Sequence, residues 1–264
     1  MSMSQSINSI LANADYFVLL FFRVGALFIS SPIFGRINIP QIVKITFMGA
    51  LTFLFFLVGP PPTALEYSSL FGFVLLIAKE IVIGIALAYI TNIFFSLTFT
   101  AGQIIDMQIG FGIVNVYDPQ NNTQIPMIGN LLNVVLVIAF FLVDGHQRLI
   151  YLIFLTLEAL PIGTLALSGD TGIVMLEVFA NAFAIGVMVA LPVLASGLII
   201  EFTFGMLARS VPQLHMFVIG MPLKTAIGFV LLVVLMPVFM NFSGRIFEEM
   251  FSALDMVFGT LRGL

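Results

Sequence analysis

Seven apolar runs, separated by polar or proline- and glycine-rich segments, set the pattern of this chain. They cover residues 16–34, 45–59, 70–105, 127–143, 149–167, 173–200 and 217–241. The connections between them are longer than the two-residue turns of hairpins, and the runs do not alternate as the strands of a β-barrel would. The pattern therefore predicts an all-α protein.

Composition extends this prediction to the membrane. Residues of the AVILMFWYC set make up 61% of the chain, 8% are charged, and the mean hydropathy is +1.18. A soluble globular chain is nearer half apolar and a quarter charged. We therefore expect an integral membrane protein with about six long apolar helices, in which 149–167 is a partial or re-entrant element. Six spans place Arg36, Lys44 and Arg209 on one side, expected to be the cytoplasm, with the N-terminus outside.

Charge and cysteine content narrow the chemistry. The formal net charge of −4 is thinly spread, and no basic cluster for nucleic acid or anionic lipid stands out. The chain has no cysteine, which excludes disulfides and thiolate chemistry. No phosphate-binding GxxxxGK[ST], HExxH or GxSxG motif occurs, so we expect neither an enzyme nor a cofactor.

Residues 101–126, AGQIIDMQIGFGIVNVYDPQNNTQIP, are the most unusual stretch. Gly110 and Gly112 bracket Phe111 and give the backbone conformations that a Cβ would forbid. Asp118-Pro119 is a turn former further on. In a membrane protein, irregular backbone is tolerated only where protein buries it or water reaches it. The segment is either a solvated connection or is folded into the interior of an assembly. Its pairing of glycines with apolar residues favours the second.

Ionisable residues inside or beside apolar runs are costly, so they usually face protein or water. Adjacent residues on a helix point apart, so Lys79 and Glu80 should each meet a partner on another helix or subunit. We predict that these buried charges set helix and subunit registry: Arg23, Lys79, Glu80, Asp106, Glu201, Arg209 and Lys224. The same ionisable residues keep an ion-coupled small-solute transporter open as an alternative, although no inverted repeat with matching broken helices is evident.

Five short motifs occur in an order that resembles the pattern of a known protein family. They are Arg23 with Pro32 and Gly35, AGQIIDMQ-G-G-NVYDP from residue 101, DGH at 144–146, RSVPQL from 209 and GMPLK from 220. In this order, over nearly the whole chain, they resemble the FliR/SctT family of type III export-gate proteins, and the flagellar branch is preferred over the virulence branch. One departure is DGHQR, where the family suggests an Asn before the glycine and a second His after His146.

The resemblance implies an assembly. A single copy of such a chain would join five FliP and four FliQ subunits, with FlhB as a further partner, in a right-handed helical spiral. The spiral would conduct unfolded flagellar proteins across the bacterial inner membrane, with part of it raised towards the periplasm. The chain would comprise a FliP-like part, 1–168, and a FliQ-like helical hairpin, 169–264, that ends in a short amphipathic tail.

The resemblance also assigns the loop after the third run, within 106–126, as a plug inside the pore. The residues expected to form this plug are Gln108, Gly110, Phe111, Gly112, Ile113, Val114, Asn115, Asp118 and Pro119. An apolar plug would exclude ions by dewetting a narrow channel. A structural subunit with no gating role is a further alternative, and it would tolerate changes in this loop.

Overall fold

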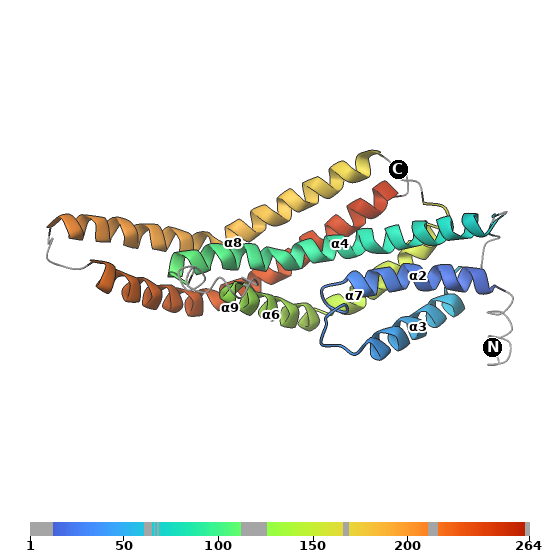
Figure 1. Cartoon of the computed structure of the whole chain (residues 1–264), viewed down its shortest axis with the longest axis horizontal. Coiled ribbons are helices and arrows are strands. Elements are labelled where there is room, and N and C mark those ends of the chain that lie inside the picture. Colours follow the sequence, from blue (N-terminus) through green and yellow to red (C-terminus); the bar gives the residue numbers. More distant parts are fainter. Residues whose placement is uncertain are drawn as a thin grey trace. The chain divides into compact units, whose positions relative to one another are not determined.

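A computed structural model describes residues 13–60, 65, 67, 69–111, 126–165, 169–210 and 216–261. Regular structure within these residues is α-helical (Figure 1). The helices are α2 (Ala14–Ser30), α3 (Gln41–Val58), α4 (Leu70–Ile109), α6 (Met127–Leu142), α7 (Gly145–Ala159), α8 (Gly169–Ser210) and α9 (Met216–Leu261). The predicted all-α membrane fold is confirmed.

The number of long apolar helices is lower than the predicted six. In the part of the chain that the structure describes, four helices, α3, α4, α8 and α9, are long and apolar enough to cross a membrane. The pair α6 and α7, bent by 69° at a short break, adds a fifth if it counts as one broken span. Helix α2, which the prediction counted, has only 17 residues.

Three helices are much longer than a bilayer needs. Helix α4 has 40 residues, α8 has 42 and α9 has 46. At about 1.5 Å per residue, 40 residues extend about 60 Å, twice the hydrocarbon thickness of about 30 Å. Helix α9 also passes through Pro222 and Pro237 to Leu261, so the predicted amphipathic tail is the continuation of this helix and not a separate element.

Two compact units make up the chain, each assembled from segments distant in sequence. The first unit comprises Met1–Ile93, Asp144–Phe179 and Glu249–Leu264, and the second comprises Phe94–Val143 and Ala180–Glu248. The expected division of the sequence at 168/169 coincides with the start of α8 at Gly169, and residues 166–168 lie outside the described residues. The FliP-like and FliQ-like assignment of the two halves stays a prediction.

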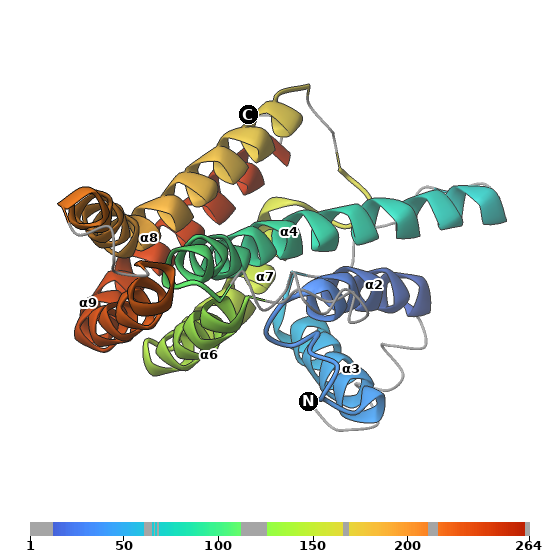
Figure 2. The ribbon, with the colours of Figure 1, turned by 60° about the vertical axis from the view of Figure 1, so that its left-hand side comes forward.

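Aromatic and aliphatic packing holds the first unit together. Helix α2 lies beside α3 (Figure 2), and Tyr16 meets Phe56 edge-on with ring centroids 6.2 Å apart. Leu19, Leu20 and Val24 of α2 are fully buried. Helix α2 also passes very close to α4, since a Cβ on Gly84 would lie 2.6 Å from the carbonyl oxygen of Arg23. Glycine is therefore required where these two backbones meet.

The second unit is built on the C-terminal part of α4. A Cβ on Gly102 would lie 2.1 Å from both N and Cα of Gly129, so the backbones of α4 and α6 are in direct contact there. Asn133 of α6 donates to the carbonyl oxygen of Phe95, at 3.3 Å, and so satisfies its amide in an apolar setting. Helices α8 and α9 run side by side as a hairpin (Figures 1 and 2).

Candidate functional site

The end of α4 brings together most of the predicted site residues that the structure describes. The helix stops because Gly110 takes a φ of 100°, a left-handed conformation that glycine adopts without strain. The N–H of Gly110 still bonds to the carbonyl oxygen of Asp106, at 3.1 Å. The hydroxyl of Thr225, on α9, donates to the carbonyl oxygen of Ile109 at 2.8 Å and satisfies one of the free carbonyls of the last turn.

This end corrects the predicted loop boundary. The sequence predicts that Asp106 and Gln108 belong to a loop, but both lie in the last turn of α4, and irregular backbone begins only at Gly110. The helix continues because Ile105 and Ile109 are both buried within the second unit. The sequence pattern could not show this, because the polar residues at 103, 106 and 108 interrupt the apolar run without interrupting the helix.

Gln108 bridges α4 to both helices of the hairpin. Its Nε2 donates to the carbonyl oxygen of Leu194 on α8, at 3.3 Å. Its Oε1 accepts from Nζ of Lys224 on α9, also at 3.3 Å. The amide lies against Gly197, where a Cβ would come within 2.9 Å of it. Gly197 therefore leaves the space that the Gln108 side chain occupies.

Lys224 is held in turn by Glu201. The ammonium of Lys224 pairs with Oε1 of Glu201, so this ion pair links α8 to α9. The exposed fractions of the two side chains are 18% for Lys224 and 52% for Glu201. Two of the predicted registry charges thus meet each other and, through Lys224, the end of α4.

Asp106 fixes the start of the next helix. Its Oδ1 accepts from the backbone N–H of Ile128, at 3.3 Å. This N–H belongs to the first turn of α6, where a helix has no backbone acceptors of its own and favours a negative charge. One side chain of α4 therefore binds the helix that follows the central segment, and the Gly102–Gly129 contact lies one turn away.

Phe111 is the last residue that the structure describes before the segment 112–125, which lies outside the described residues. Its ring meets Phe229 of α9 edge-on, with centroids 5.6 Å apart and an interplanar angle of 75°. The other predicted plug residues, Gly112, Ile113, Val114, Asn115, Asp118 and Pro119, lie outside the described residues. Their assignment as a plug stays a prediction.

A second group of charges lies in the first unit. Nε of Arg23 is 2.5 Å from Oε2 of Glu80, and Nη1 of Arg23 donates to the carbonyl oxygens of Thr156 and Leu160 at 3.1 and 2.9 Å. Oε1 of Glu80 accepts from the N–H of Gly163 at 2.8 Å. The Arg23–Glu80 pair therefore joins α2 and α4 to the end of α7 and the turn that follows it.

Not all seven predicted charges are buried. Arg23, Glu80 and Asp106 are buried, whereas Lys79, Glu201 and Arg209 are exposed and Lys224 is half-buried. Lys79 and Glu80 differ because neighbouring helix positions face different directions. Glu80 points to Arg23, while Nζ of Lys79 reaches the carbonyl oxygen of Gly163 at the surface, at 3.3 Å. Lys79, Glu201 and Arg209 are thus exposed within this chain alone, and the assignment of the seven charges to helix or subunit registry stays a prediction.

Sequence reasoning missed three residues that pack against the end of α4: Gly197 of α8, and Thr225 and Gly228 of α9. A Cβ on Gly228 would lie 2.6 Å from Cγ1 of Ile109, so Gly228 makes room for the last residue of α4. The only signal in the sequence was a glycine inside an apolar helical run, which is common in membrane helices. Nothing local indicates which helix such a glycine faces.

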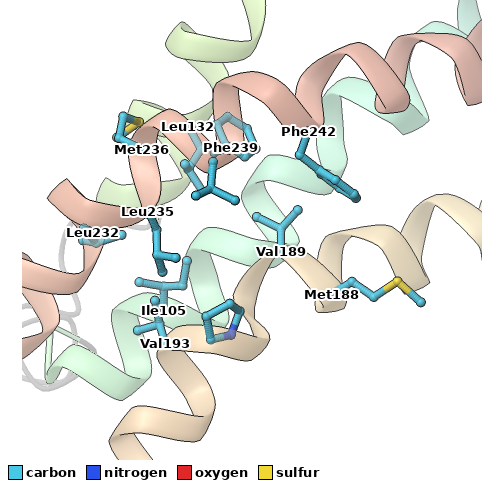
Figure 3. Close-up of a pocket in the computed structure, with 12 residues that line it drawn as sticks. Ile105, Leu132, Met188, Val189, Val193, Leu232, Leu235, Met236, Phe239 and Phe242 are labelled. Atoms are coloured by element: carbon cyan, nitrogen blue, oxygen red, sulfur yellow. The ribbon is translucent and has the colours of Figure 1, made fainter.

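An apolar cavity of about 200 Å³ lies within the second unit. Figure 3 shows its walls, to which α4 contributes Ile105, α8 contributes Val189 and Val193, and α9 contributes Leu235 and Phe239. Such a lining offers nothing to bind an ion or a polar solute. Among the described residues, no group of three or more His, Asp or Glu side chains is placed to hold a metal ion.

Comparison with known proteins adds the family. Residues 14–250 match the family described as "Bacterial export proteins, family 1". The chain belongs to this family. It is 33% identical to the flagellar biosynthetic protein FliR of Bacillus subtilis over 88% of this chain and 90% of that protein. It is 32% identical to FliR of Escherichia coli over 88% of each chain. FliR of Aquifex aeolicus is 23% identical over 90% of this chain and 92% of its own length.

Membership of the FliR family makes this chain a component of flagellar protein export. Its long apolar helices place it in the membrane part of the flagellar apparatus. The resemblance inferred from the five ordered motifs is therefore confirmed.

Proposed function

We propose that this chain forms part of the inner-membrane channel for unfolded flagellar proteins, and that the segment that follows α4 plugs this channel. One observation carries the proposal: both ends of the segment are anchored to helices. Thr225 and Gln108 fix the end of α4, and Asp106 fixes the first turn of α6. An apolar, glycine-jointed segment between two fixed ends can fill a narrow pore and exclude water.

The plug is proposed to comprise Gln108, Gly110 to Asn115, Asp118 and Pro119. Phe111 supports an apolar contact face, because its ring already packs against Phe229. Gly110 supports a joint at the root of the segment, because a positive φ lets the chain turn sharply away from the helix axis. The chain supplies no catalytic or nucleotide site in this proposal, so the energy for export comes from partner proteins.

The proposed assembly contains one copy of this chain with five FliP and four FliQ subunits, and FlhB binds to it. Extensive exposed apolar surface supports such partners. In the most apolar 18-residue stretch of each candidate span, at most 28% is buried within this chain. The length of α4, α8 and α9 supports an assembly raised partly towards the periplasm. Helices of 40 residues or more extend well beyond the hydrocarbon core.

Ion conductance tests the plug. In the co-expressed membrane complex, residues 110–115 are replaced by a shorter polar linker, and ion leak across the inner membrane is measured. A plug predicts a clear rise in leak. The matched control changes Asn121 and Asn122 to Ser in the same segment, which preserves its length and its apolar residues, and should leave leak at the wild-type level. Unchanged conductance in the linker variant would contradict the plug.

Mass spectrometry of the native complex tests the assembly. The complex, purified in mild detergent after co-expression with the neighbouring membrane subunits, should contain a single copy of this chain among roughly ten. A self-sufficient monomer that takes up a small solute saturably would instead support a carrier. The apolar lining of the 200 Å³ cavity gives no support to a carrier for ions or polar solutes.

A further inference from the structure

The side chain of Gln108 ties the end of α4 to both helices of the α8–α9 hairpin. Its amide touches Leu194 of α8 and Lys224 of α9, each at 3.3 Å. It can make both contacts because it is both a donor and an acceptor. Residue 108 is two positions before Gly110, so whatever holds this amide also holds the root of the following segment.

The hold of Lys224 on Gln108 depends on how α8 and α9 are paired. Lys224 is on α9, and Glu201, its ionic partner, is on α8. If the two helices separate or slide, the ammonium cannot keep both Glu201 and Gln108. Because Glu201 is half exposed, this ion pair is the kind that contributes little to stability and can be exchanged easily. It is therefore suited to switching rather than to holding the fold together.

Helix α8 has a weak point beside Gln108. Pro192 has no N–H, so the carbonyl of Met188 loses its usual helical donor. The 200 Å³ cavity borders Met188, Pro192 and Val193 (Figure 3). Leu194, which accepts from Gln108, comes two residues after this proline. The cavity and the hydrogen bond lost at Pro192 thus lie close to Leu194, where α8 holds the end of α4.

We infer that Gln108, Lys224 and Glu201 form a latch through which the α8–α9 hairpin holds the root of the segment after α4. Lys224 acts as a positioning residue: its ammonium, held by Glu201, fixes the Gln108 amide in the space left by Gly197. Moving α8 relative to α9 releases Gln108 and loosens the last turn of α4. The consequence for ion leak rests on the proposed plug, whereas the loosening of α4 does not.

Two readouts separate the latch from the plug. The chain has no cysteine, so a single Met107→Cys, at an exposed position of α4, carries a spin label in the co-expressed complex. Lys224→Met removes the donor and retains most of the apolar stem. Loss of a charge-assisted hydrogen bond should raise the population of the released α4 end roughly tenfold, seen as label mobility and as increased ion leak. Arg245→Met removes an exposed cation from the same helix and should change neither readout.

Gly197→Ala supplies a second variant that keeps every charge. Its Cβ would displace the Gln108 amide, so label mobility should rise as it does in Lys224→Met. If Lys224→Met fails to assemble, this variant decides the inference. Unchanged mobility in a variant that assembles overturns the latch. If the polar linker variant leaks while Lys224→Met and Gly197→Ala alter neither mobility nor leak, the plug stands and the latch is wrong. If the linker variant does not leak, the plug fails, and mobility alone decides the latch.

Discussion

Arg23 and Glu80 form a buried ion pair, with Nε of the arginine 2.5 Å from Oε2 of the glutamate and side-chain exposures of 1% and 0%. Each charge is further satisfied by backbone groups: Arg23 by the carbonyls of Thr156 and Leu160, and Glu80 by the N–H of Gly163. Removing such charges from water is costly, and extra hydrogen bonds of this kind offset the cost. The pair therefore determines how α2, α4 and the end of α7 fit together.

Breaking this pair from one side should be more damaging than removing it. Glu80→Leu leaves the guanidinium buried without its counter-charge, and should lower the free energy of unfolding by about 3–5 kcal/mol. The double variant Arg23→Met, Glu80→Leu should recover part of this loss, because no unpaired charge is left. Thermal unfolding of the purified complex measures both. A double variant that is less stable than the single one would show that backbone hydrogen bonding, and not charge pairing, dominates.

Gly102 should tolerate no side chain. The added methyl of Gly102→Ala would lie 2.1 Å from backbone atoms of Gly129, so α4 and α6 must move apart, at a cost of about 3 kcal/mol. Gly244→Ala is the control, because Gly244 also lies in a helix but has nothing within 4 Å of its added Cβ. It should stabilise α9 by about 0.5–1 kcal/mol. Equal melting temperatures for the two variants would refute the contact.

Asp106 should protect the first turn of α6 from hydrogen exchange. Asp106→Ala removes the acceptor of the Ile128 N–H, and loss of such a cap costs about 1 kcal/mol. Exchange of the Ile128 amide should therefore become about fivefold faster. Asp106→Asn keeps an acceptor oxygen and should show a smaller effect. Hydrogen exchange followed by mass spectrometry resolves the peptide, and equal protection in wild type and Asp106→Ala would disprove the role.

The positive φ of Gly110 should make this position sensitive to any side chain. Gly110→Ala forces an L-residue into a left-handed conformation, at a cost of about 1–2 kcal/mol. Gly205→Ala, in α8 with open space around its Cβ, should instead be neutral or slightly stabilising. The comparison uses thermal unfolding together with exchange of the last turn of α4. The finding that both substitutions act alike would argue against a backbone requirement at 110.

Tyr67 gives the chain a feature that depends on alkaline pH. Its hydroxyl donates to Oδ2 of Asp15. This hydrogen bond is the main cause that raises the pKa of Tyr67 above the ordinary 10.0, and desolvation is a smaller one. A raised pKa favours the protonated hydroxyl, so the contact persists below about pH 10 and is lost as the pH rises through the higher value. Ultraviolet titration of wild type against Tyr67→Phe isolates this group. Asp15→Asn should return the pKa of Tyr67 towards the ordinary value. If Tyr67 titrates at the same pH in Asp15→Asn and in wild type, the contact is ruled out.

The sequence was sufficient to predict the all-α membrane class and the family. Long apolar runs predict helices because such a chain in a membrane must satisfy its backbone hydrogen bonds internally. Gly110 and Pro126 mark the end of α4 and the residue before α6, because a positive φ and a missing N–H act locally. The five ordered motifs were enough for the resemblance. These signals need no knowledge of which segments meet in space.

Tertiary structure alone decided which residues meet. Helix α4 is apolar on nearly every side, so no face of it is marked as core, and the pairing of Gly102 with Gly129 or of Arg23 with Glu80 cannot be read from spacing. Arg23 and Glu80 are 57 positions apart in the sequence, and tertiary packing, which local sequence does not encode, brings them together. For the same reason, Lys79 is exposed beside a buried Glu80. Gln108 reaches Lys224 across 116 positions, a contact that only the folded second unit creates.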